Sequence, residues 1–208
     1  MRNEAKDLRA RECNRTEFAN ARFIIPDTNL IVNLGGRSGW QWCFEKRLRG
    51  FLEENDQQLL VCKSCLLELQ KLARSDDPEL AQQAAGGLQF VSDLYSRGRL
   101  FFCEDGGSID QIRDEGFADP FTKDAALALF EHGNVLVITN DNDLAWDLLS
   151  QRAVKSRYYL HVAAVSRYGW LYKPKAFYEL KRHKKWRDAQ KKHREGSGWR
   201  NGGEFNEI

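Results

Sequence analysis

The chain has 208 residues, of which 42% are hydrophobic and 30% charged, and its formal net charge is +2. This length suits one domain with appendages, and the apolar runs are too short to cross a bilayer. The first 22 residues lack the apolar core of a signal peptide, and the five cysteines show no repeating spacing. We therefore expect reduced thiols and a cytoplasmic protein, or a nuclear one in a eukaryote, with no membrane contact.

Apolar runs that alternate with helical patterns predict βαβ units and a mostly parallel sheet. Residues 3–20 are expected to form a helix or a loose leader, and the glycine-rich stretch at residues 35–39 a flexible loop. Gly86 and Gly87 are expected to weaken the helix that contains them. Strands are predicted at residues 22–25, 59–62, 99–103, 135–138 and 158–162, and helices at residues 40–54, after a Ser64 cap, and at residues 78–95, 119–132 and 142–152.

Acidic residues stand where these strands end. Asp27 directly follows the first strand, and Asp141 follows the fourth. Glu68 lies on the helix after the second strand, and Asp124 on the helix that leads into the fourth. Because ligands of open α/β sheets bind beyond the carboxyl ends of the strands, the four carboxylates are predicted to meet there and hold Mg²⁺ or Mn²⁺. Asp143 would add a further oxygen.

Each of these acids also has a purely structural explanation. Asp27 and Asp141 are suited to capping the helices that follow them. Glu68 and Asp124 each have a lysine nearby on the same helix and would form a surface ion pair with it. The prediction of a metal site therefore rests on all four occurring together.

Four segments resemble the motifs of the PIN-domain ribonucleases, and they occur in that family's order. The segments are residues 25–29 (Ile-Pro-Asp-Thr-Asn), 66–69 (Leu-Leu-Glu-Leu), 123–128 (Lys-Asp-Ala-Ala-Leu-Ala) and 139–144 (Thr-Asn-Asp-Asn-Asp-Leu). The resemblance implies a three-layer α/β/α fold with a five-stranded parallel sheet. We assign this PIN-like domain to residues 21–172, between a leader or helix at residues 1–20 and a basic helical arm at residues 173–208, whose end is expected to be disordered.

The same resemblance implies a metal-dependent endoribonuclease. It would cut single-stranded RNA with a metal-activated water and leave a 5′-phosphate and a 3′-hydroxyl. A PIN-like module that binds RNA or a protein partner with little cleavage, and the toxin of a toxin–antitoxin pair, are the alternatives, and the oligomeric state stays open. The carried-over residues are the catalytic metal ligands Asp27, Glu68, Asp124 and Asp141, the additional metal ligand Asp143, and the supporting residues Thr28, Asn29 and Thr139.

The C-terminal segment is strongly basic. Residues 173–200 hold 11 Lys and Arg against 3 acidic residues, a local charge of +8, whereas the rest of the chain carries −6. Interleaved aromatic residues favour contact with RNA, through phosphates and stacked bases. A solvated charged helix, a targeting signal and docking onto an acidic protein partner are the alternatives. The predicted RNA-binding residues are Lys181, Arg182, Lys184, Lys185 and Arg187.

Cys62 and Cys65 are spaced like a thioredoxin-type redox pair between a strand and a helix. There is no second pair of this kind in the sequence to complete a zinc site. Reduced, half-buried thiols are therefore the preferred interpretation.

Overall fold

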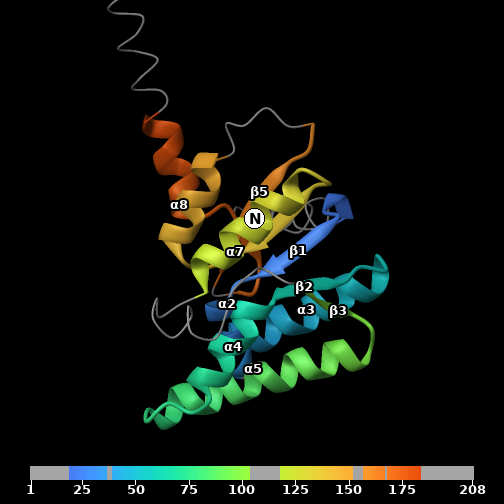
Figure 1. Ribbon diagram of the computed structural model, residues 1–208, viewed down its shortest axis with the longest axis vertical. Coiled ribbons are helices and arrows are strands. Elements are labelled where there is room, and N and C mark those ends of the chain that lie inside the picture. Colours follow the sequence, from blue (N-terminus) through green and yellow to red (C-terminus); the bar gives the residue numbers. More distant parts are fainter. Residues whose placement is uncertain (1–18, 37–38, 104–117, 152–156, 167, 184–208) are drawn as a thin grey trace, which may run out of the picture.

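A computed structural model describes residues 19–36, 39–103, 118–151, 157–166 and 168–183, which form an α/β fold around one sheet (Figure 1). Within this described part, no helix is both long and apolar enough to cross a membrane. The six strands are β1 (Phe23–Pro26), β2 (Leu59–Cys62), β3 (Leu100–Cys103), β4 (Val135–Ile138), β5 (Leu160–Val165) and β6 (Leu171–Tyr172).

The strands lie in the order β3-β2-β1-β4-β5-β6. The first five are parallel to their neighbours, while β6 pairs antiparallel with β5. The expected five-stranded parallel sheet is therefore corrected to a mixed sheet of six strands. The chain builds outward from β1 through β2 to β3 and then crosses back to place β4 on the other side of β1. The strand order thus reverses between β1 and β4, and such a switch point opens a crevice beyond the strand ends.

Strand β6 is held in place by Arg47 of the helix at residues 40–54. Arg47 donates from its Nη1 to the backbone oxygens of Tyr168 at 2.6 Å and Gly169 at 2.9 Å, in the turn before β6. Its guanidinium also lies 3.5 Å from the ring centre of Trp170. A two-residue strand has little intrinsic stability, so these contacts from a helix far away in the sequence account for its position.

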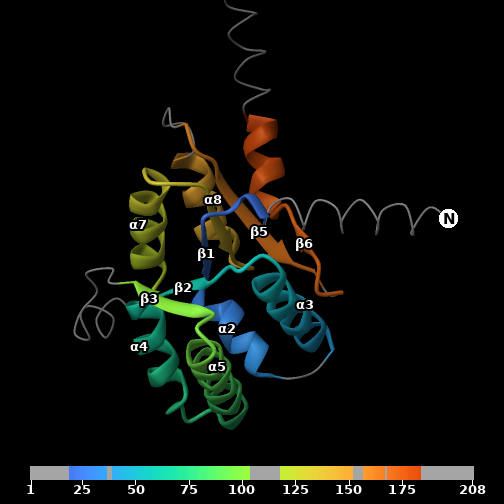
Figure 2. The ribbon, with the colours of Figure 1, turned by 90° about the vertical axis from the view of Figure 1, so that its right-hand side faces the viewer.

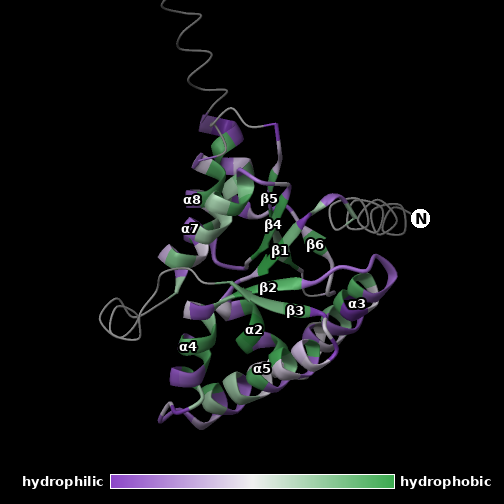
Figure 3. Ribbon diagram, turned by 45° about the vertical axis from the view of Figure 1, so that its right-hand side comes forward, coloured by the Kyte–Doolittle hydropathy of each residue, from purple (hydrophilic) through white to green (hydrophobic). Residues whose placement is uncertain are grey.

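The helices form two groups. In Figure 1, α2 to α5 gather below β2 and β3, whereas α7 and α8 lie beside β5, and the turned view of Figure 2 keeps the groups apart. Figure 3 shows the hydrophobic residues concentrated on the strands and on the inward sides of the helices. The helices are α2 (Thr28–Gly35), α3 (Trp40–Glu54), α4 (Lys63–Leu72), α5 (Pro78–Ser96), α7 (Asp119–Phe130) and α8 (Asn142–Gln151), and a further helix covers residues 175–183.

Several boundaries agree with the sequence predictions, notably those of α3, β2 and β4. Others differ by one to three residues at an end, such as β1, β3 and α7. The larger differences are that helix α2 was not predicted, that α4 begins at Lys63 with Cys62 rather than Ser64 as its N-cap, and that β5 covers Leu160–Val165 instead of residues 158–162. The predicted leader lies almost wholly outside the described residues.

The start of the basic arm belongs to the folded domain. Ala176 is fully buried in the main hydrophobic core, and Phe177 and Leu180 pack against it. The backbone N–H of Ala176 donates to the Asn142 side chain at 3.0 Å, which ties this helix to α8. Removing the whole basic arm would therefore remove side chains of the core. A truncation that tests the charge of the arm has to leave the chain intact up to His183.

Glycines set the spacing between α2 and α5. A Cβ on Gly35 would stand 1.8 Å from the backbone oxygen of Gln83, and one on Gly87 would stand 2.7 Å from that of Ile31. The helix α5 nevertheless runs unbroken for 19 residues. The expected weakening near Gly86 and Gly87 is therefore replaced by a packing role, and Gly35, expected in a loop, ends α2.

We expect Gly87→Ala to lower the free energy of unfolding by about 1–2 kcal/mol, because the added methyl pushes α5 away from α2. Gly50→Ala is the matched control. Gly50 lies inside α3 with nothing within 4 Å of an added Cβ, so alanine should stabilise the protein by roughly 0.5–1 kcal/mol. Urea unfolding of both variants measures the two effects, and equal effects of the same sign would contradict the close helix contact.

Candidate functional site

Asp27 is a buried carboxylate at the end of β1. It is only 1% exposed, and its Oδ1 accepts the backbone N–H of Leu30 at 2.6 Å, which caps α2. Its Oδ2 accepts the hydroxyl of Thr139. The pKa of Asp27 is raised to about 7. Burial is the main cause, the two hydrogen bonds act in the opposite direction, and the negative charges of Asp119 and Asp141 add to the rise.

Thr139 joins the ends of two neighbouring strands. It follows β4, which pairs with β1 in register, Pro26 opposite Ile138. While its hydroxyl donates to Asp27, the same oxygen accepts the backbone N–H of Asp141 at 2.9 Å. Asp141 in turn caps α8, since its Oδ1 accepts the N–H groups of Asp143 at 2.7 Å and Leu144 at 2.9 Å. One chain of hydrogen bonds therefore connects the two acids across the switch point.

Asp119 is the acid that the sequence analysis missed. It is the first residue of α7 and is half-buried. Burial raises its pKa to about 6, with the charges of Asp141 and then Glu68 adding to the effect. Glu68 reaches the same place from α4, because its Oε2 accepts the backbone N–H of Ala118 at 3.2 Å. The shared field thus unites Asp27, Glu68, Asp119 and Asp141, which we call the acidic cluster.

The remaining predicted residues are less central. Asp124 is exposed on α7, five residues beyond Asp119, and Lys123 beside it pairs with Asp147 at 3.4 Å. Asp143 is exposed and contributes its backbone N–H to the cap of α8. Asn29 is exposed on α2, and its carbonyl oxygen accepts the side chain of Asn33 at 2.7 Å. Asp27 and Asp141 do cap the helices that follow them, as the structural explanation predicted, and this does not exclude a role in binding.

The chemistry of the acidic cluster fits a hard divalent cation. It consists of carboxylate oxygens, whose mutual repulsion a cation would relieve. Among the described residues, Thr28 is buried beside Asp27 with no hydrogen-bond partner for its Oγ1, so a polar atom next to the cluster is left over. In the same described ranges, however, no three His, Cys, Asp or Glu side chains stand close enough together to hold a metal ion. Binding would require the carboxylates to draw together.

Of the predicted RNA-binding residues, Lys181 and Arg182 are exposed on the helix over residues 175–183. Lys184, Lys185 and Arg187 lie outside the described residues. Cys62 and Cys65 are free and buried, and the thiol of Cys103 donates to the sulfur of Cys62 at 3.4 Å. The raised pKa of Cys62, caused first by its contacts with Cys103 and Cys65, disfavours the thiolate that redox chemistry needs.

Comparison with known proteins assigns no family. The chain matches none of the protein-family models, and no curated protein matches it. The resemblance to PIN-domain ribonucleases therefore rests on the four short motifs in the sequence.

The pKa of Asp27 provides a test of this geometry in the metal-free protein. We expect its carboxyl signal in a ¹³C NMR titration to move near pH 7 rather than near 3.8. Thr139→Val should raise that pKa further, because the carboxylate loses a donor. Thr122→Val is the matched control, since Thr122 is a buried threonine that contacts Cys65 at 3.3 Å, and it should leave the titration of Asp27 nearly unchanged.

The raised pKa of Asp27 also determines whether the stability of the protein rises or falls with pH. Folded Asp27 keeps a proton that the unfolded chain releases above about pH 4, so the metal-free protein should lose stability as the pH rises from about 4 to about 7. A stability that rises through this window, with Asp27 titrating near its ordinary value, would contradict the buried placement.

Proposed function

We propose that the protein is a metal-dependent endoribonuclease of the PIN type, which hydrolyses single-stranded RNA internally and leaves a 5′-phosphate and a 3′-hydroxyl. The observation that carries the proposal is the acidic cluster at the switch point of the sheet. Asp27 and Asp141 follow the two strands between which the order reverses, and two helices add Glu68 and Asp119. Ligands of α/β sheets bind at this point.

The fold is compatible with the proposal. Five parallel strands in the order β3-β2-β1-β4-β5 form the main part of the sheet, with helices in two groups. We interpret this arrangement as the three-layer α/β/α fold expected from the resemblance, extended by β6 and by the helix over residues 175–183.

The four residues of the acidic cluster would hold Mg²⁺ or Mn²⁺. A bound divalent ion would neutralise charge on the scissile phosphate and lower the pKa of a water molecule. The chain itself prepares the ligands. Thr139 orients Asp27 by donating to Oδ2 and fixes the turn before Asp141, while Glu68 holds the start of α7, next to Asp119, by accepting the backbone N–H of Ala118. In this proposal Asp119 takes the place that the motif resemblance gave to Asp124.

One observation favours the alternative of a binding module that barely cleaves. Asp27 and Asp141 both act as helix caps, and the described acids do not converge tightly enough to chelate an ion. Caps of this kind stabilise a fold without any metal. The binding module and the enzyme differ in the effect of Mn²⁺ on RNA.

Substitution of the two acids on α7 provides the sharpest test of cleavage. Asp119→Asn should lower the rate of RNA cleavage in Mg²⁺ or Mn²⁺ by about 100-fold or more, because the metal ion loses a negatively charged ligand. Asp124→Asn is the matched control on the same helix and should retain a rate close to that of the unaltered protein. Cleavage is followed with end-labelled single-stranded RNA, and EDTA should abolish it.

If Asp124→Asn lost cleavage while Asp119→Asn kept it, Asp124 would be the metal ligand and our assignment of Asp119 would be rejected. Cleavage that persists at full rate in EDTA would reject the metal-dependent mechanism. Absence of cleavage by the folded protein in both metals, with RNA still bound, would favour the binding module.

A further inference from the structure

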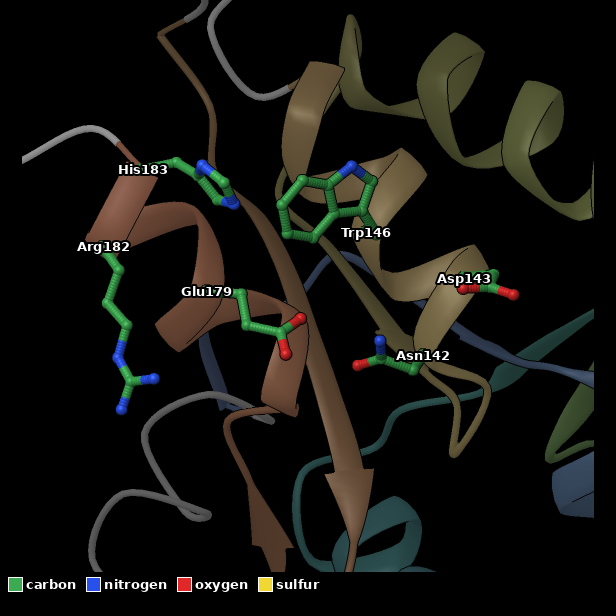
Figure 4. Close-up of a pocket in the computed structure, with 6 residues that line it drawn as sticks. All are labelled: Asn142, Asp143, Trp146, Glu179, Arg182 and His183. Atoms are coloured by element: carbon green, nitrogen blue, oxygen red, sulfur yellow. The ribbon is translucent and has the colours of Figure 1, made fainter. Parts of the chain in front are cut away.

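A groove begins at the residue that follows Asp141 of the acidic cluster. It lies between α8 and the helix over residues 175–183 and has a volume of about 500 Å³. The size lies within the usual range for small-molecule sites and accommodates a nucleoside. The lining residues are Asn142, Asp143, Trp146, Glu179, Arg182 and His183 (Figure 4).

The aromatic part of the groove is built from both helices. Trp146 on α8 and His183 on the other helix face each other in Figure 4, with ring centres 5.8 Å apart and planes at 87°. The edge contact with His183 holds the indole in place, and Trp146 is only half-buried. Indole rings are sequence-tolerant platforms for nucleobases, because every base has a π-face.

The polar part of the groove disfavours a phosphate inside it. The Glu179 carboxylate lies in the middle of the lining in Figure 4, paired with Lys175 at 3.2 Å, and Asp143 adds a second negative charge at the edge. Arg182 extends away from the indole and is exposed. This distribution suits a neutral base in the interior with its phosphate at Arg182.

The two walls are fixed relative to each other. Asn142 on α8 accepts the backbone N–H of Ala176 at 3.0 Å, and Ala176, near the start of the other helix, is fully buried. The groove therefore belongs to the packed domain, and a ligand in it would meet a preformed surface.

From these observations we propose that the groove binds one nucleobase of a single-stranded RNA, stacked on Trp146, with the adjoining phosphate at Arg182. The strand then continues past Asp141 to the acidic cluster. This subsite rests on the proposed nuclease function and gives it a substrate contact: a nucleotide flanking the cleaved bond, held by its base. Because the groove would take an unpaired base, it would favour single-stranded over paired RNA.

The test compares two short RNAs of equal length and charge, one of mixed sequence and one with abasic nucleotides throughout. Their affinity for the full chain is measured by fluorescence anisotropy in EDTA. Trp146→Leu keeps an apolar side chain at the position but removes the stacking surface. It should weaken binding of the mixed-sequence RNA by about five- to twentyfold and leave the affinity for the abasic RNA unchanged.

Tyr95→Ala is the control for a general loss of exposed aromatic surface. Tyr95 is 57% exposed on α5, in the other group of helices, so its removal should not distinguish the two RNAs. Trp146→His provides a second aromatic variant of lower stacking power, and it should give an intermediate effect if Trp146→Leu proves poorly folded.

Three results would overturn the subsite. Equal effects of Trp146→Leu on both RNAs, with metal-dependent cleavage intact, would reject the groove and leave the nuclease function standing. Absence of RNA binding in both EDTA and Mg²⁺ would reject the groove together with the nuclease. An arginine-rich peptide that binds the unaltered protein but not Trp146→Leu, without any base-dependent effect, would assign the groove to a basic protein partner.

Discussion

The hydrogen bond from the Thr139 hydroxyl to the Asp27 carboxylate is the interaction on which the rest of the site depends. It joins the ends of β1 and β4, the two parallel strands between which the strand order reverses. A carboxylate buried this deeply is costly when it is charged, and the hydrogen bonds from Thr139 and Leu30 offset part of that cost. The same threonine oxygen holds the turn before Asp141, so the two acids are positioned by a single side chain.

The cluster also explains why helix caps and a metal site need not be competing interpretations. A carboxylate that caps with one oxygen has its second oxygen and further lone pairs for other partners. Asp141 uses Oδ1 for both cap hydrogen bonds, and this residue lies just after the end of β4. Burial is the main cause of the raised pKa of Asp27 and of Asp119, and repulsion within the cluster adds to it; a bound cation would offset that repulsion by attracting the carboxylates.

Local sequence signals predicted the central elements well, since β4 is a run of apolar residues and α3 has an amphipathic pattern. The features that were missed depend on distant contacts. β6 has two residues and is held by Arg47 from α3. Asp119 and Asp124 both lie on α7, roughly 140° apart around the helix axis, and the packing of α7 on the domain, which the sequence alone does not give, leaves Asp119 half-buried beside Glu68 and Asp124 exposed. Helix α2 was hidden because Gly35 suggested a loop, whereas its role is close packing on α5.

In the function that we propose, the groove and the acidic cluster would together guide RNA along the N-terminal end of α8. Asp141 caps this helix, Asn142 ties it to the helix over residues 175–183, and Trp146 stands one turn further on. The proposed path depends on a cation that the four residues of the acidic cluster would hold. A crystal structure of the protein with Mn²⁺, in which the anomalous signal locates the ion, tests directly whether the acidic cluster binds a cation. We expect an ion coordinated by Asp27, Asp119 and Asp141, with Glu68 at its side; an ion bound instead at Asp124, or no ion in the cluster at saturating Mn²⁺, would contradict it.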